Sequence, residues 1–128
     1  MTRKELLIEN PELNEYQFLS GQTALYPGQG EFQGLVYCLL KLGGEAGEVL
    51  EKVGKLLRDS GVEWDSDPKS WPADVQLAIK KELGDVLWYI GGVARECGWT
   101  LQDVAETNLD KLESRQNRGM IHGSGDNR

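Results

Sequence analysis

Apolar residues recur at alternating steps of four and three through a long stretch of the chain, residues 35–57. The positions are Leu35, Leu39, Leu42, Ala46, Val49, Val53 and Leu56. This spacing predicts an amphipathic α-helix with one buried stripe. Residues 79–97 repeat the pattern at Ile79, Leu83, Val86, Ile90, Val93 and Cys97. We therefore expect two long helices that pack against each other through these stripes.

Capping residues and turn formers divide the chain into four predicted helices. Asn10-Pro11-Glu12 is a typical helix start, and Thr100 with Asp103 resembles a capping box before the last helix. The predicted helices span about residues 11–25, 31–58, 73–97 and 101–116. Turn formers predict a loop over residues 59–72, and residues 117–128 are a Gly-rich tail. No strand pattern occurs, so the sequence predicts a single all-α domain over residues 1–128.

The composition argues against several classes of function. The net charge is −7 and no run of basic residues occurs, which argues against binding of a nucleic acid polymer. No apolar run approaches the ~20 residues that cross a membrane. The first residues do not resemble a signal peptide, so we expect a cytoplasmic protein. Cys38 and Cys97 lie in helical patterns, which favours reduced, buried thiols over a disulfide or metal framework.

Two pairs of acidic residues have the same position relative to the two stripes. Glu45 and Glu48 are three residues apart in the first stretch, and Glu82 and Asp85 are three residues apart in the second. Each acid directly precedes a stripe position, so packing of the helices would place four carboxylates around one small volume. Hard oxygen ligands in that number suit Mg²⁺ or Mn²⁺.

Glycines surround the first acid pair, although each costs a helix ~1 kcal/mol relative to Ala. They are Gly43, Gly44 and Gly47. We expect them to allow close approach of a backbone, an ion or a ligand. The alternative for the acids is a solvated flank paired with Lys41, Lys52, Lys80 or Lys81.

Two other kinds of metal site fit the sequence poorly. A ferritin-like di-iron site needs two Glu-x-x-His pairs, and the only histidine, His122, forms neither. An EF-hand needs Asp-x-Asp-x-Asp-Gly, but Asp65-Ser66-Asp67 is followed by Pro68.

The last predicted helix changes character along one face. The face begins with Leu101 and Val104 and continues with Asn108, Lys111 and Arg115. A helix face whose apolar side chains are followed by amide, ammonium and guanidinium groups is typical of a helix that lines a polar pocket. Lys and Arg are also the side chains that usually bind phosphate. A plain surface face, with Leu109 and Leu112 carrying the packing, remains the alternative.

These motifs together resemble the MazG-like all-α nucleoside triphosphate pyrophosphohydrolases. The resemblance is carried by Glu45-x-x-Glu48, then Glu82-x-x-Asp85, then Asn108-Leu-x-Lys111-Leu-x-x-Arg115, and it covers roughly residue 26 to the end. Single-domain and phage-borne members have a similar ending. The family usually has a further Glu where this chain has Gly44, and the gap between Glu48 and Glu82 is longer than is common.

The resemblance implies a four-helix-bundle-like fold that assembles as a homodimer or as a dimer of dimers. It also implies Mg²⁺-dependent cleavage of a (d)NTP between its α- and β-phosphates. The implied metal ligands are Glu45, Glu48, Glu82 and Asp85, and a Glu of the first pair would help a metal-polarised water attack phosphorus. The implied substrate-binding residues are Lys111, Arg115, Asn108, Lys41, Lys52 and Tyr89. The tail would close over a pocket and bring His122, Asn127 or Arg128 to the phosphates.

Two other functions are compatible with the same residues. A helical interaction or regulatory protein without catalytic activity could carry the acids only for solubility, and the loss of a family Glu at Gly44 favours that reading. A phosphatase that releases orthophosphate is a second alternative. Analysis of the products formed from each nucleotide separates the three.

Overall fold

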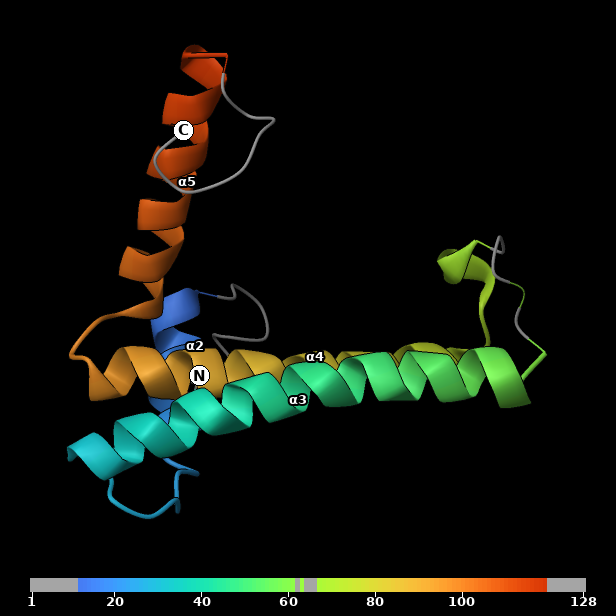
Figure 1. Cartoon of the computed structure of the whole chain (residues 1–128), viewed down its shortest axis with the longest axis horizontal. Coiled ribbons are helices and arrows are strands. Elements are labelled where there is room, and N and C mark those ends of the chain that lie inside the picture. Colours follow the sequence, from blue (N-terminus) through green and yellow to red (C-terminus); the bar gives the residue numbers. More distant parts are fainter. Residues whose placement is uncertain (1–11, 62, 64–66, 120–128) are drawn as a thin grey trace, which may run out of the picture.

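The fold of the chain was analysed in a computed structural model, which describes residues 12–61, 63 and 67–119 (Figure 1). These residues contain four α-helices and no strand, so the predicted all-α class is confirmed. The elements are α2 (Leu13–Gly21), α3 (Phe32–Asp59), the short 3₁₀ helix η1 (Pro68–Ser70), α4 (Ala73–Glu96) and α5 (Leu101–Asn117). Within the described residues, every helix is too short or too polar to cross a membrane.

The two long helices, α3 and α4, lie side by side and run in opposite directions (Figure 1). Their limits agree with the prediction to within one or two residues. Gly98 ends α4 with a φ of 73°, a left-handed conformation that favours glycine. The predicted loop between α3 and α4 contains η1, where the Asp67 side chain accepts a hydrogen bond from the Lys69 backbone N–H at 3.0 Å.

The face that α3 and α4 turn toward each other is displaced by one residue from the predicted stripes. On α3 the buried positions are Gly34 and Cys38, whereas Leu39 is 50% exposed. On α4, Leu83 is 52% exposed. Displacement by one residue rotates a helix by about 100°. Glu45 and Glu82, which each directly precede a stripe position, are therefore turned toward the shared face, and their side chains are only 14% and 13% exposed.

The first helix ends earlier than predicted, at Gly21 rather than near Leu25. In the connection after the helix, Ala24 and Tyr26 are buried, whereas Leu25 between them is 94% exposed. A Cβ at Gly21 would lie 2.6 Å from the Arg95 guanidinium, so the helix passes close to α4 at its last residue. The helix starts at Leu13, and the predicted Asn10-Pro11 start lies outside the described residues.

The core is small and lies at one end of the α3–α4 pair. Ala24, Tyr26 and Cys38 form its buried centre. Partly buried side chains packed around this centre are Tyr37, Trp88, Tyr89 and Val93. A Cβ on Gly92 of α4 would lie 3.1 Å from the Cys38 sulfur, so the absence of a side chain there lets the two helices approach.

The last helix, α5, leaves the end of α4 and points away from the α3–α4 pair (Figure 1). It contacts α2 and α4, and Leu101 in its first turn is buried. Within one chain, the four described helices therefore do not close into a bundle. The predicted cap is confirmed in part, because the Thr100 hydroxyl accepts a hydrogen bond from the Asp103 N–H at 3.0 Å.

Side chains of α2 fix the start of α5. The Gln17 side chain accepts from the Leu101 N–H at 3.0 Å and donates to the Trp99 carbonyl at 3.0 Å. Asn14 accepts from the Gln102 N–H at 3.1 Å. Backbone N–H groups in the first turn have no partner within their own helix, so these amides act as caps supplied by another helix.

Replacing Gln17 with alanine should therefore loosen α5. We expect the free energy of unfolding to fall by about 1–2 kcal/mol, because a capping interaction and a second hydrogen bond are lost. Urea denaturation followed by circular dichroism measures this change. Gln116→Ala on the exposed part of α5 is the matched control, and equal stability of the two variants would contradict the capping role.

The two cysteines are free thiols, as predicted, but they differ in burial. Cys38 is fully buried, whereas Cys97 at the end of α4 is only partly buried. Burial also raises the pKa of the Cys38 thiol. We expect a thiol reagent to modify Cys97 in the folded protein and Cys38 only on unfolding. Rapid modification that persists in Cys97→Ser would contradict this assignment.

Candidate functional site

Three of the four predicted acids come together between α3 and α4. Carboxylate oxygens of Glu45, Glu48 and Glu82 all lie within 4.8 Å of one another. The side chains of Glu45 and Glu82 are only 14% and 13% exposed, whereas Glu48 is exposed. Three carboxylates this close repel one another unless cations neutralise them.

Lysines of α3 supply part of that neutralisation. Lys41 lies 3.6 Å from Glu45, and Lys52 donates a hydrogen bond to Glu82 at 2.9 Å. The bond to Glu82 raises the pKa of Lys52, and the charges of Glu82, Glu48 and Asp85 add to the effect. The predicted pairing of the acids with lysines is therefore present for these two, and the lysines share the face of the acid cluster.

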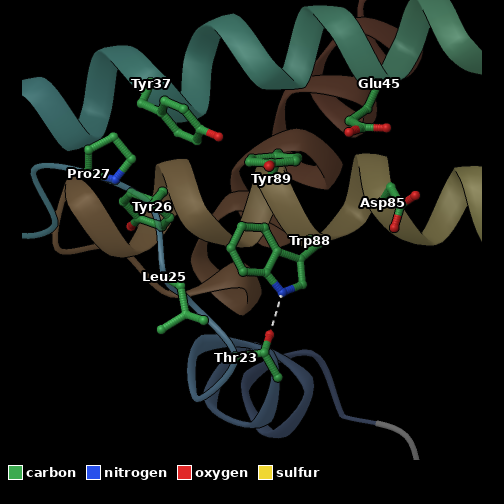
Figure 2. Close-up of a pocket in the computed structure, with 9 residues that line it drawn as sticks. All are labelled: Thr23, Leu25, Tyr26, Pro27, Tyr37, Glu45, Asp85, Trp88 and Tyr89. Carbon is green, nitrogen blue, oxygen red and sulfur yellow. Dashed lines mark hydrogen bonds between the residues drawn. The ribbon is translucent and has the colours of Figure 1, made fainter.

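The fourth predicted acid, Asp85, is outside this group of three. It is exposed on α4, one turn after Glu82, and it lines a cavity together with Glu45 (Figure 2). A small rotation of its side chain is enough to turn it toward Glu82, since residues three apart share one face of a helix.

The spacing of the three oxygens fits one small divalent cation. Ligands of Mg²⁺ lie 2.0–2.1 Å from the ion, so oxygens on opposite sides of it are roughly 4.2 Å apart. The three carboxylate oxygens already lie within 4.8 Å of one another, so movement of their side chains alone can bring them to a single ion. Because all three donors are carboxylates, the group suits a hard cation such as Mg²⁺ or Mn²⁺.

A cavity of about 490 Å³ extends from the acids to an aromatic end (Figure 2). Glu45 and Asp85 lie at one end, and four aromatic rings lie at the other: Tyr26, Tyr37, Trp88 and Tyr89. Trp88 lies edge-on to Tyr89 with ring centroids 4.8 Å apart, and its indole N–H donates to the Thr23 hydroxyl at 3.0 Å. The cavity thus combines charge at one end with flat apolar rings at the other.

Tyr26 and Tyr89 of the cavity stay protonated. Burial raises the pKa of Tyr89 to about 12, helped by Tyr37. Burial and the hydrogen bond to Glu96 raise the pKa of Tyr26 to about 12. Both phenols are therefore neutral hydrogen-bonding groups at any pH near 7.

Sequence reasoning named Tyr89 but missed Tyr26, Tyr37 and Thr23. Tyr26 and Thr23 belong to the connection between α2 and α3, where no hydrophobic periodicity marks a buried side chain. The alternation of buried Ala24, exposed Leu25 and buried Tyr26 is a two-residue period, but it is too short to stand out in the sequence.

The predicted phosphate-binding face of α5 does not reach the acids within one chain. Asn108 is exposed, Lys111 is partly buried and Arg115 is only 4% exposed. None of the three lines the cavity, and Figure 1 shows that α5 points away from α3 and α4. The predicted tail contacts of His122, Asn127 and Arg128 lie outside the described residues.

The glycines around the first acid pair face open space. A Cβ at Gly43, Gly44 or Gly47 would have no described atom within 4 Å, beyond its own helix backbone and chain neighbours. The predicted close approach of another stretch of backbone is therefore absent among the described residues.

Comparisons with known proteins identify the family. The profile of the MazG nucleotide pyrophosphohydrolase domain matches residues 33–120. Gene 37 protein of Mycobacterium phage L5 is 43% identical over 116 residues, which cover 88% of this chain and 96% of the phage protein. The chain belongs to the MazG nucleotide pyrophosphohydrolase family, and the resemblance seen in its motifs is confirmed.

Two more distant relatives have names that state an activity. The proteins named dCTP pyrophosphatase 1 from Mus musculus and Rattus norvegicus are 28% and 27% identical to this chain, each over 116 residues. The matched part covers 88% of this chain but 61% of either mammalian protein. No solved structure gives a significant match.

Proposed function

We propose that the chain is a Mg²⁺-dependent nucleoside triphosphate pyrophosphohydrolase, which converts a (d)NTP into the monophosphate and pyrophosphate. One observation carries the proposal: Glu45 belongs to a cluster of three carboxylates and also lines, with Asp85, one end of a cavity whose other end is aromatic (Figure 2). A nucleotide has the same polarity, with a charged phosphate chain at one end and a flat base at the other. Membership of the MazG family supports the reaction type.

Glu45, Glu48 and Glu82 would hold the ion, and Asp85 would complete the set from the next turn of α4. A bound Mg²⁺ supplies charge neutralisation of the phosphates and polarisation of the attacking water. Glu45 or Glu48 accepts the proton of that water. The water oxygen forms a bond to the α- or the β-phosphorus. The attacked phosphorus loses its bond to the oxygen that bridges the two phosphates, and the monophosphate and pyrophosphate separate.

Lys41 and Lys52 balance the acids before substrate binds and then share their positive charge with the phosphates. Both lysines already lie against site carboxylates, Lys41 against Glu45 and Lys52 against Glu82. At the other end, Tyr89 contacts the sugar or the base. Stacking of a base on an aromatic ring contributes about 1–3 kcal/mol and tolerates any base.

The active form is a homodimer or a dimer of dimers, in which α5 of one subunit reaches the acids of another. Asn108, Lys111 and Arg115 then bind phosphate or a sugar hydroxyl across the subunit boundary. Large apolar side chains on the outer side of α3 support assembly: Phe32, Leu40 and Leu50 are 78%, 72% and 74% exposed in one chain. Apolar side chains of this size, repeated along one helix, are typical of a covered surface.

The test is a panel of ribo- and deoxynucleotides with Mg²⁺ or Mn²⁺, analysed for pyrophosphate and orthophosphate separately. dCTP is tested first because two relatives are named after it. Release of pyrophosphate supports the proposal, whereas orthophosphate alone indicates a phosphatase. No product from any nucleotide, with a melting temperature that Mg²⁺ leaves unchanged, would support an interaction protein of the same fold instead.

A further inference from the structure

A second acidic group, Glu96, ties the connection between α2 and α3 to the end of α4. Its carboxylate accepts hydrogen bonds from the Tyr26 hydroxyl and, at 2.9 Å, from the Gly30 backbone N–H. Glu96 is the last residue of α4 and does not line the cavity. No role in metal binding or hydrolysis explains it, because it lies at the aromatic end of the molecule, away from the acid cluster.

Tyr26 is the ring through which Glu96 affects the cavity. It is buried and stacks on Tyr37 with centroids 5.7 Å apart and an angle of 12° between the planes. Its ring meets Trp88 edge-on at 6.1 Å. Any shift of Tyr26 is therefore passed to two other rings of the aromatic end (Figure 2).

Arg95 holds the same ring from a different direction. Its guanidinium lies 5.9 Å from the centroids of both Tyr26 and Trp88, and it donates to the Tyr26 hydroxyl at 3.3 Å. The hydroxyl thus donates to Glu96 and accepts from Arg95, which uses both of its hydrogen-bonding capacities in one orientation.

The connection has no regular structure of its own to hold Tyr26 in place. Gly28 and Gly30 have φ values of 72° and 81°, and the segment turns back onto the first turn of α3. A Cβ on Gly34 would lie 2.3 Å from the Gly28 carbonyl oxygen, so the segment rests directly on that helix. Among the described residues, its hydrogen bonds with α4 run from Tyr26 and Gly30 to Glu96, from Arg95 to Tyr26 and from Trp88 to Thr23.

We propose that Glu96 is a positioning residue: by binding Tyr26 and Gly30 it fixes the aromatic end of the cavity and thereby sets the affinity for the nucleoside part of the substrate. The inference rests on the proposed function. It assigns separate roles to the two ends of the cavity: the acid cluster determines the rate of the chemical step, and Glu96 determines the affinity for the nucleoside.

The test compares Glu96→Gln and Tyr26→Phe with the parent protein. Glu96→Gln removes the charge and keeps the size, and Tyr26→Phe removes only the hydroxyl and keeps the buried ring. We expect each to raise KM for the best nucleotide about tenfold, with kcat within about twofold of the parent. In the double variant the increase in KM should be smaller than the product of the two single increases, because both changes disrupt the Tyr26–Glu96 hydrogen bond.

Glu106→Gln on exposed α5 is the matched control, since its side chain pairs only locally with Gln102 at 2.9 Å. Binding of a non-hydrolysable α,β-imido nucleotide, followed by tryptophan fluorescence, measures affinity without turnover. A parental KM in both variants, or a lowered kcat with unchanged KM, would overturn the proposal. Additive effects in the double variant would also overturn it, because two independent losses of stability produce that result.

The same experiment keeps the two proposals apart. If the parent protein forms no pyrophosphate, the proposed hydrolase function fails before any variant is compared. If the parent forms pyrophosphate and the variants bind nucleotide as the parent does, the hydrolase function stands and only the role of Glu96 fails.

Discussion

Replacing Glu48 with glutamine is expected to lower pyrophosphate release at least about 100-fold, because the amide loses one of three converging negative charges. Glu48 is the most exposed of the three, so the change leaves the packing of α3 and α4 intact. Affinity for Mg²⁺, measured by calorimetry, should fall together with activity. Loss of activity with parental metal affinity would instead assign Glu48 to proton transfer alone.

Stability provides a second measurement on the same variant. Without metal, removal of one of three mutually repelling carboxylates should raise the melting temperature slightly. Added Mg²⁺ should stabilise the parent, since a ligand that binds the folded state adds RT ln(1 + [L]/Kd), and should stabilise Glu48→Gln much less. Glu51→Gln is the control, because Glu51 is exposed and pairs with Lys55 at 3.0 Å on the same helix. Equal behaviour of the two variants would contradict a metal site at Glu48.

Local signals predicted the helix limits well. Gly98 and Thr100 mark the end of α4 and the start of α5 through backbone and capping geometry that depends only on nearby residues. The early end of α2 at Gly21 was not predicted, and a Cβ at this residue would lie 2.6 Å from the guanidinium of Arg95, 74 residues away by number (95 − 21). Sequence spacing carries no record of such a contact between distant residues.

The side of each long helix that faces the other was predicted only to within one residue. Apolar spacing assigned Leu39 and Leu83 to the buried side, but both are half exposed. The shared face instead carries the Lys52–Glu82 ion pair and the carboxylates near it. The spacing of apolar residues indicates which face of a helix is covered. It does not indicate whether that face is covered by the same chain or by another subunit.

The acid cluster was the part of the site that sequence could predict. Two pairs at the same spacing on two helices must meet if the helices pack, and three of those acids do come together. The aromatic end could not be predicted from the sequence. Tyr26 is held there by a hydrogen bond to Glu96, 70 residues later in the chain, and is followed by a turn that needs Gly28 and Gly30. Tertiary contacts of irregular segments have no periodic signature.

Mixing two inactive variants is expected to restore activity if α5 acts on a neighbouring subunit. Glu48→Gln removes a carboxylate from the acid cluster, and Lys111→Ala removes a cation from α5. In a dimer with shared sites, a mixed pair contains one site that carries both defects and one site that carries neither. Random pairing makes half of the dimers mixed, so co-expressed variants should recover about a quarter of parental activity.

The physical reason is that, within one chain, α5 points away from α3 and α4, the helices that carry the acids (Figure 1). If Lys111 served its own acids, every site in the mixture would carry one defect and activity would stay at the level of the single variants. The control is the double variant Glu48→Gln/Lys111→Ala co-expressed with Glu48→Gln, in which no pairing yields an intact site. Light scattering on the same samples measures assembly, and a mass of one 14.3 kDa chain would exclude shared sites whatever the activity. Recovery near a quarter, absent from the control, requires that a cation of one subunit completes the acid cluster of another.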